Sequence, residues 1–188
     1  MHRHAYNDPG HAHFLTFSCY HNHQFLADDH VRHLLAEAIN GARQIESFSL
    51  WAYVFMPDHV HLQIHPNEDE YSIPAILRRI KEPVTRAVAR YWGEAAPNKL
   101  DLMKAHQGGR IVHRLWQAGA GYDRNLPHFD AVNKAVEYIE WNPVRRGYVT
   151  KPTDWIWSSA RAREGMRDVP LGIDSLEVAL SSSRVGLM

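Results

Sequence analysis

Two histidines in the segment Tyr53–His65, YVFMPDHVHLQIH, have the residue type and spacing of a metal site. Pro57 and Asp58 interrupt an apolar run there, and polar and apolar residues alternate after them. Because successive side chains of a β-strand point to opposite faces, His59 and His61 are predicted to lie on the same face. Two imidazoles on one face of a rigid strand can bind one divalent cation together.

Spacing alone does not decide this interpretation, because the chain has 14 histidines and the His-x-His pattern occurs four times. The pairs are His2/His4, His11/His13, His21/His23 and His59/His61. Only the last pair lies among apolar residues and beside the most hydrophobic segment, which would hold the rings rigidly. The alternative is a polar sheet face whose histidines are satisfied by hydrogen bonds.

A tyrosine and an asparagine at the end of a predicted helix are candidates to complete the site. The apolar side of this helix, Phe129 to Trp141, is formed by Phe129, Val132, Ala135, Val136 and Ile139. Tyr138 and Asn142 are four residues apart and are therefore neighbours on one helix face, at the border of that apolar side. The amide oxygen of Asn142 could bind the metal, and Tyr138 could present its hydroxyl beside it. The alternative for Tyr138 is ordinary packing.

The elements that would position these residues follow the order βαββαβ. The predicted strands are His11–Tyr20, Phe48–Met56, His59–His65 and Arg110–Gln117. The first predicted helix is capped by Asp28 or Asp29 and continues through Ala42, and the second begins at Ser72 or Pro74 and ends at about Trp92. Pro83 predicts a kink in the second helix. This order is that of an α+β, ferredoxin-like fold, an antiparallel sheet with both helices on one face. The helix that carries Tyr138 is an addition to it.

The length of 188 residues predicts one domain with a substantial core. Cys19 is the single cysteine, so no internal disulfide can form and a reducing compartment is expected. No apolar stretch approaches the ~20 residues that cross a bilayer, and no signal peptide is found. A cytoplasmic protein without a membrane partner is therefore expected. Residues 164–188 show little pattern and are predicted to be a peripheral tail.

Charge is segregated along the chain although the net charge is zero. Residues 78–163 contain sixteen Lys or Arg against eight acids, whereas residues 1–77 contain three against nine. A basic stretch is either a solvated face or a surface that contacts phosphates. The candidate phosphate contacts are Arg78, Arg79, Lys81, Arg86 and Arg90 on the second helix, and Arg145 and Arg146 after the tyrosine helix. Trp116, Trp141 and Trp155 are candidates for stacking on bases, with core packing as the alternative.

Four segments taken in order resemble the successive motifs of the REP-associated tyrosine transposases. These are a branch of the HUH single-strand transposases, in which two histidines flank a hydrophobic residue. The segments are MPDHVHLQI, LWQAGAGYDRNL at 115–126, AVEYIEWNPVRRGYV at 135–149 and DWIWSSARA at 154–162. The resemblance runs from about His13 to Ala162 and implies an HUH tyrosine transposase domain over residues 1–163.

The resemblance implies a role for each site residue. His59 and His61 would be the metal ligands, Asn142 would assist the metal, and Tyr138 would be the nucleophile, with Tyr122 as the alternative nucleophile. The cofactor would be Mg²⁺ or Mn²⁺, with zinc less consistent with the family. The substrate would be single-stranded DNA with a hairpin, cut and rejoined through a 5′-phosphotyrosine. Monomer and homodimer both remain open, as does action of Tyr138 in its own or a partner subunit.

Three other functions compete with this interpretation. A non-catalytic hairpin-binding module on the same fold would need neither the metal nor Tyr138. A metal-dependent nuclease that uses water would survive the loss of Tyr138. A histidine-rich metal-binding protein would bind metal through its N-terminal histidines as strongly as through His59 and His61.

Overall fold

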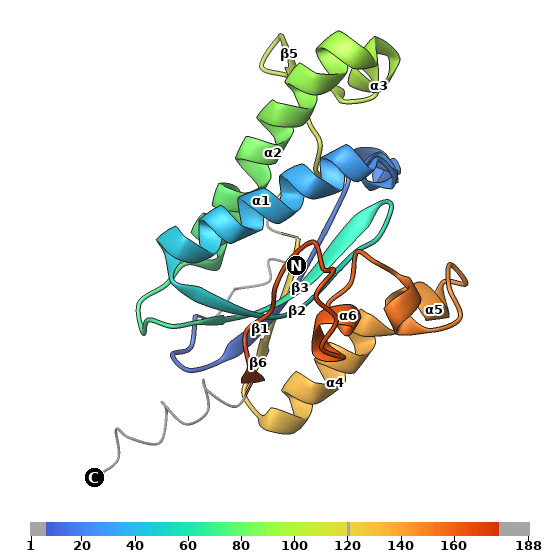
Figure 1. Ribbon diagram of the computed structural model, residues 1–188. Helices are drawn as coiled ribbons and strands as arrows, with labels where there is room; N and C mark the ends of the chain where they lie inside the picture. Colours follow the sequence, from blue (N-terminus) through green and yellow to red (C-terminus); the bar gives the residue numbers. More distant parts are fainter. Residues whose placement is uncertain (1–6, 120, 177–188) are drawn as a thin grey trace.

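A computed structural model describes residues 7–119 and 121–176 of the chain. Its centre is a four-stranded antiparallel sheet in the order β2-β3-β1-β6 (Figure 1). The strands are β1 (Ala12–Ser18), β2 (Phe48–Phe55), β3 (His59–Pro66) and β6 (Tyr122–Leu126). The predicted histidine strand, β3, is an inner strand with β1 and β2 as neighbours. The α+β, ferredoxin-like arrangement expected from the sequence is confirmed.

Two long helices, α1 (Asp29–Glu46) and α2 (Ile73–Ala95), cover one face of the sheet (Figure 1). Each begins at a capping side chain, since Asp28 accepts a hydrogen bond from the amide of His30 and Ser72 accepts one from Ala75. Their buried apolar residues join Val60, Leu62 and Ile64 of β3 in the main core. α2 extends through Pro83 as one helix of 23 residues.

The helix α4 (Phe129–Glu140) lies on the opposite face of the sheet (Figure 1). Its buried residues Val136 and Ile139 pack against Ala52, Val54 and Met56. A register shift between Leu50 and Ala52 interrupts the alternation of β2. As a result, Trp51 and Ala52 both point away from the main core and pack in the two smaller clusters. Phe129 was expected on the apolar side of α4, but it is the first residue of the helix and is 52% exposed.

The fourth strand of the sheet is not the one predicted. Arg110–His113, β5, pairs with Lys104–Gln107, β4, in a separate hairpin. Gly108 and Gly109 both have positive φ, at 56° and 75°, which is the geometry of a tight two-residue hairpin turn and favours local pairing. The edge beside β1 is instead occupied by β6.

The remaining described elements are short. They are the 3-10 turns η1 (Tyr20–Asn22), η2 (Phe25–Ala27) and η3 (Pro152–Asp154), and the helices α3 (Pro97–Asp101), α5 (Asn142–Arg145) and α6 (Ala160–Arg163). Within the described ranges, no helix combines the length and apolar character needed to cross a membrane.

The segment after Arg163, expected to be a peripheral tail, contacts the domain over its described part. Leu171 is 1% exposed and belongs to the main core. The carboxylate of Asp174 accepts hydrogen bonds from Arg43, at 2.6 Å, and from the amide of Leu50, at 2.7 Å. Residues 177–188 of the expected tail lie outside the described residues.

Candidate active site

His59 and His61 lie side by side on the face of β3 opposite to the main core. Their ring centres are 4.8 Å apart, and the side chain of Val60 between them is buried in the core. Both histidines are buried, with exposed fractions of 7% and 5%. Pairing of β3 on both edges fixes the backbone beneath the two rings, so the alternation predicted from the sequence produces a rigid pair.

The Nδ1 atom of each histidine has a polar partner. Nδ1 of His61 is 2.7 Å from Oγ1 of Thr16, which is the residue opposite His61 on β1. Nδ1 of His59 is 2.6 Å from a carboxylate oxygen of Asp58. When Nδ1 donates to these oxygens, the lone pair of Nε2 is left for a metal, as is usual for metal-binding histidines. Thr16 and Asp58 are site residues that motif reading missed. For Asp58, its position directly before His59 is the sequence feature that could have indicated a role in the site.

Burial keeps the His61 ring neutral. Removal from solvent, with smaller contributions from His59 and Arg146, lowers the pKa of His61 to about 3. The neutral imidazole is the form that binds a metal. At physiological pH, His61 is therefore ready to act as a ligand.

Tyr138 and Asn142 reach the histidine pair from α4 and from the start of α5. Tyr138 is 45% exposed, and its ring centre lies 5.6 Å from that of His61. Asn142 is 4% exposed, and its Nδ2 lies 3.2 Å from Nε2 of His61. Trp141 is both the C-cap of α4 and the N-cap of α5, so its backbone joins the two helices. This junction places a half-exposed hydroxyl and a buried amide beside the same imidazole.

The polar atoms around His61 suit a divalent cation. Among the described residues, Oδ1 of Asn142 is buried without a hydrogen-bond partner. The oxygen and nitrogen of an amide are assigned from their surroundings, so a turn of this amide would direct the oxygen to the ion. In the described part of the chain, no three His, Cys, Asp or Glu side chains converge as a metal cluster. Two imidazoles and one amide would therefore leave coordination positions for substrate oxygens or water.

A sequence model of the IS200-like transposases matches residues 9–104, just over half of the chain. The chain belongs to the IS200-like transposase family. A Haemophilus influenzae protein named as a REP-associated tyrosine transposase is 30% identical to this chain over 114 residues. Those residues are 60% of this chain and 58% of that protein, so the match spans less than two thirds of that relative's length.

A solved structure described as the REP-associated tyrosine transposase bound to a REP hairpin has the same fold as this chain. The TM-score is 0.69 at 20% identity, and the likeness covers 93% of this chain and 92% of that one. At this identity the comparison establishes the fold. The family match includes His59 and His61 but ends before α4. The assignment of Tyr138 and Asn142 to the site is therefore based on the geometry described above.

The basic residues predicted to contact DNA fall into two groups on opposite faces of the sheet. Arg145 and Arg146 lie beside the candidate site, both exposed. The guanidinium of Arg145 lies 5.1 Å from the centre of the Tyr138 ring and donates to the Tyr138 carbonyl oxygen at 3.4 Å. Arg145 and Arg146 therefore bring positive charge next to the hydroxyl-bearing ring and to His61.

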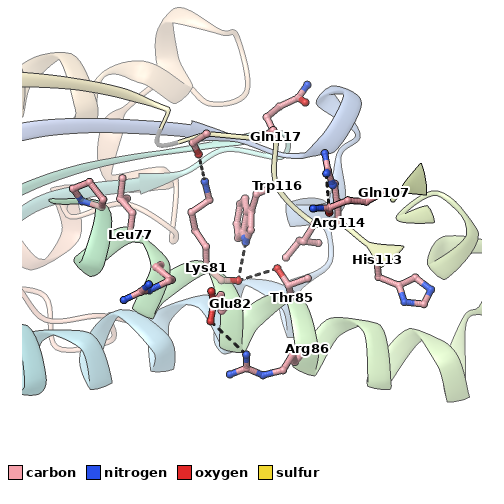
Figure 2. A pocket seen from close by; sticks show the side chains of 15 residues that line it. Leu77, Lys81, Glu82, Thr85, Arg86, Gln107, His113, Arg114, Trp116 and Gln117 are labelled. Carbon is pink, nitrogen blue, oxygen red and sulfur yellow. Dashed lines mark hydrogen bonds and ion pairs between the residues drawn. The ribbon is translucent and has the colours of Figure 1, made fainter. Parts of the chain in front are cut away.

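The second group lines α2 on the other face. A groove of about 650 Å³ lies between α2 and residues 113–119 and is lined in part by Arg78, Lys81 and Arg86. Figure 2 shows Lys81 and Arg86 on its α2 side. Arg78, Arg79, Arg86 and Arg90 are exposed, although Arg79 forms an ion pair with Glu46 and Arg86 lies 3.7 Å from Glu82. These arginines are not brought to the histidine pair.

Lys81 has a contact within the chain. Its ammonium donates to the carbonyl oxygen of Gly119 at 3.0 Å (Figure 2). It also lies 5.5 Å from the Phe17 ring centre. Burial lowers the pKa of Lys81. The indole of Trp116 donates to the Lys81 carbonyl oxygen at 3.2 Å. Lys81 thus holds the segment that leads from β5 to β6, rather than standing free for a phosphate.

The three tryptophans differ in exposure. Trp116 is 6% exposed and packs edge-on against Phe17, so the core-packing interpretation applies to it. Trp155 is half buried and donates to the Phe55 carbonyl oxygen at 3.2 Å. Trp141 is 43% exposed, so part of its ring is open to solvent.

Phe14 is a further residue of the site that the motifs did not indicate. Its ring stacks on His61 at 5.3 Å and meets Tyr138 edge-on at 5.8 Å. Tyr122, the alternative nucleophile, contacts Phe14 at 6.0 Å and lines the same cavity as Tyr138. Both tyrosines therefore lie on the site face, and Tyr138 is the one whose ring contacts His61 directly.

Proposed function

We propose that this transposase cleaves and rejoins single-stranded hairpin DNA through a 5′-phosphotyrosine on Tyr138. The observation that carries the proposal is the meeting of Tyr138, Asn142 and His61, with rings 5.6 Å apart and the amide 3.2 Å from Nε2. A half-exposed tyrosine beside two metal-competent imidazoles matches the needs of phosphoryl transfer. The same chain supplies all of these groups, which supports action of Tyr138 in its own subunit, whether the protein is a monomer or a homodimer.

His59, His61 and Asn142 would hold Mg²⁺ or Mn²⁺. The ion would supply Lewis-acid polarisation of the scissile phosphate and stabilise its developing charge. Thr16 and Asp58 keep the ligand nitrogens aimed at the site. Zinc would suit the imidazoles, but an amide with open positions for phosphate oxygens favours the harder cations.

The Tyr138 oxygen attacks phosphorus as the bond from phosphorus to the 3′ oxygen breaks. The hydroxyl proton leaves to solvent, to which the ring is open, and the departing 3′ oxygen takes up a proton. The products are a phosphotyrosine on the 5′ side and a free 3′ hydroxyl. Because the bond energy is retained in the phosphotyrosine, a 3′ hydroxyl from another strand end can reverse the step and rejoin the DNA.

The exposed arginines are proposed to bind the phosphate backbone. Arg145 and Arg146 would contact the strand at the cleavage site, and Arg78, Arg86 and Arg90 would contact DNA that reaches α2. The solved relative is bound to a REP hairpin, which supports a palindromic hairpin as the substrate here.

A denaturing gel tests the proposal. Labelled REP hairpin DNA with single-stranded flanks is incubated with Mg²⁺ or Mn²⁺ and wild type, Tyr138→Phe or Tyr122→Phe. A metal-dependent covalent adduct with wild type and Tyr122→Phe, absent with Tyr138→Phe, is the expected result. Cleavage by all three without an adduct would establish a water-using nuclease. DNA binding without cleavage would establish a binding module, and an adduct lost only in Tyr122→Phe would reassign the nucleophile.

A further inference from the structure

A cavity of about 850 Å³ opens beside Tyr138 and His61, between α4 and the edge of the sheet formed by β1 and β6. This volume is in the range of sites that hold small organic molecules. Phe14, Tyr122 and Leu126 line it from the strands. Leu126 is buried and the two aromatic residues are partly exposed, so this side of the cavity is mainly apolar.

Small residues line the helix side of the cavity. Ala131 and Ala135 line it from α4, one turn apart on the same face. Both pack on the small cluster formed by Ala12, Trp51, Leu126 and Val132. Because alanine side chains end at Cβ, they leave a slot between the helix and the aromatic side of the sheet. A slot of this kind accepts a flat ring.

The rim of the cavity is positively charged. Arg124 on β6 and Lys134 on α4 are both exposed and line the cavity from opposite sides. Among the described residues, neither takes part in an ion pair, although Asp130 lies on the same rim. Lys134 precedes Tyr138 by one helical turn, so its ammonium and the tyrosine hydroxyl share a helix face. An apolar slot with free cations at its mouth complements a nucleobase whose flanking phosphates remain outside.

We propose that this cavity binds one unpaired nucleobase of the strand that Tyr138 cleaves, with Arg124 and Lys134 holding the neighbouring phosphates. The inference rests on the proposed function and adds a base-binding site to it. The base must be unpaired, because a base within a duplex is stacked on both sides and cannot enter a slot. Stacking against aromatic side chains and cation contacts to phosphates are the usual terms of single-strand binding.

The test uses hairpin oligonucleotides whose single-stranded flank lacks one base at a time. The probe is a labelled REP hairpin with Mn²⁺ and the full chain, with binding followed by fluorescence anisotropy and adduct formation by denaturing gel. Loss of one base, next to the cleaved phosphate, is expected to weaken binding by wild type about tenfold. Loss of the other flank bases is expected to have smaller effects.

Ala135→Leu fills the slot, so this variant is expected to bind the intact and the abasic oligonucleotide with equal affinity. Asn133→Leu, on the exposed side of the same helix, is the matched control and is expected to keep the wild-type difference in affinity between the two oligonucleotides. Thermal unfolding of both variants separates loss of the slot from loss of the fold. Arg124→Gln, a change at an exposed position, is expected to weaken binding of intact and abasic oligonucleotides alike.

The outcomes separate this inference from the proposed function. If wild type forms the adduct and binds every abasic oligonucleotide equally, the base-binding site is wrong and the phosphotyrosine mechanism stands. If wild type forms no adduct but binding still depends on one base through Ala135, the cleavage proposal fails and the site stands. A base dependence that persists in a folded Ala135→Leu variant would overturn the site.

Discussion

The carbonyl oxygen of Thr16 lies so close to Gly121 that a Cβ atom at residue 121 would come within 2.1 Å of it. Gly121 also has a φ of 81°, in the left-handed region that favours glycine. It immediately precedes β6, and Thr16 is the residue whose hydroxyl contacts His61. The entry of the chain into the edge strand is therefore linked by one close contact to a candidate metal ligand.

Gly121→Ala is expected to lower the melting temperature by about 4 to 8 °C, because a backbone clash and a strained φ together cost about 2 kcal/mol. Differential scanning calorimetry measures the change. Gly119→Ala is the matched control, since Gly119 also has a positive φ, at 92°, but a Cβ there would meet open space. An equal loss in the two variants would show that strain, rather than contact with Thr16, explains the effect.

Thr16→Val is expected to raise the Mn²⁺ concentration needed for half-maximal adduct formation by about 10- to 100-fold. The change keeps the branched shape of the side chain on β1 but removes the oxygen 2.7 Å from His61 Nδ1, which orients the ring. Thr16→Ser, which keeps the hydroxyl, should remain close to wild type. A metal dependence unchanged in Thr16→Val would exclude an orienting role for the hydroxyl.

The single thiol is expected to be inert in the folded protein. Burial raises the pKa of Cys19 to about 12, and the side chain is 0% exposed. At pH 8 a thiol with such a pKa would be ionised in about one molecule in 10⁴, and the thiolate is the reactive form. Reaction with a disulfide reagent such as Ellman's reagent should therefore be slow until urea unfolds the chain. Rapid reaction of the native protein would contradict both the burial and the raised pKa.

Asp28 is expected to stabilise the fold more at neutral pH than in acid. Burial opposes its ionisation, but Lys99 at 3.0 Å and the indole of Trp92 outweigh it, so the pKa of Asp28 lies below its ordinary value. A lowered pKa in the folded state gives stability that is present above the ordinary pKa of 3.8 and lost as the pH falls through the folded value.

The size of this contribution is about 0.5 kcal/mol, because the Lys99 side chain is solvent-exposed. Asp28→Asn keeps an acceptor for the cap of α1 but removes the charge. Urea unfolding at several pH values should show a larger free energy of unfolding for wild type than for this variant at pH 7, and the difference should shrink in acid. A difference that does not change with pH would assign the effect to packing.

The histidine strand could be predicted from the sequence because its alternation is strict and one face is fully apolar. The helix caps at Asp28 and Ser72 could also be predicted, because each precedes apolar residues that recur at helical spacing. In both cases the information lies within a few neighbouring residues, which is where sequence patterns are most informative.

The edge strand could not be predicted in the same way. β6, YDRNL, is mainly polar, and the more apolar Arg110–Gln117 was the stronger strand candidate. Thr16 and Phe14 were missed for a related reason. Their contacts with His61 depend on the register between β1 and β3, 45 residues apart in the case of Thr16, which no local pattern reports.

The two faces of the sheet bear on the length of DNA that the proposed function would require. Tyr138 and the slot lie on the α4 face, whereas the α2 groove lies on the other. Residues 113–119 line the α2 groove, and β6 lines the slot. A strand that contacts both would have to bend around an edge of the sheet. Oligonucleotides below a threshold length would occupy one face only, so affinity is expected to rise in two steps as the flank is extended.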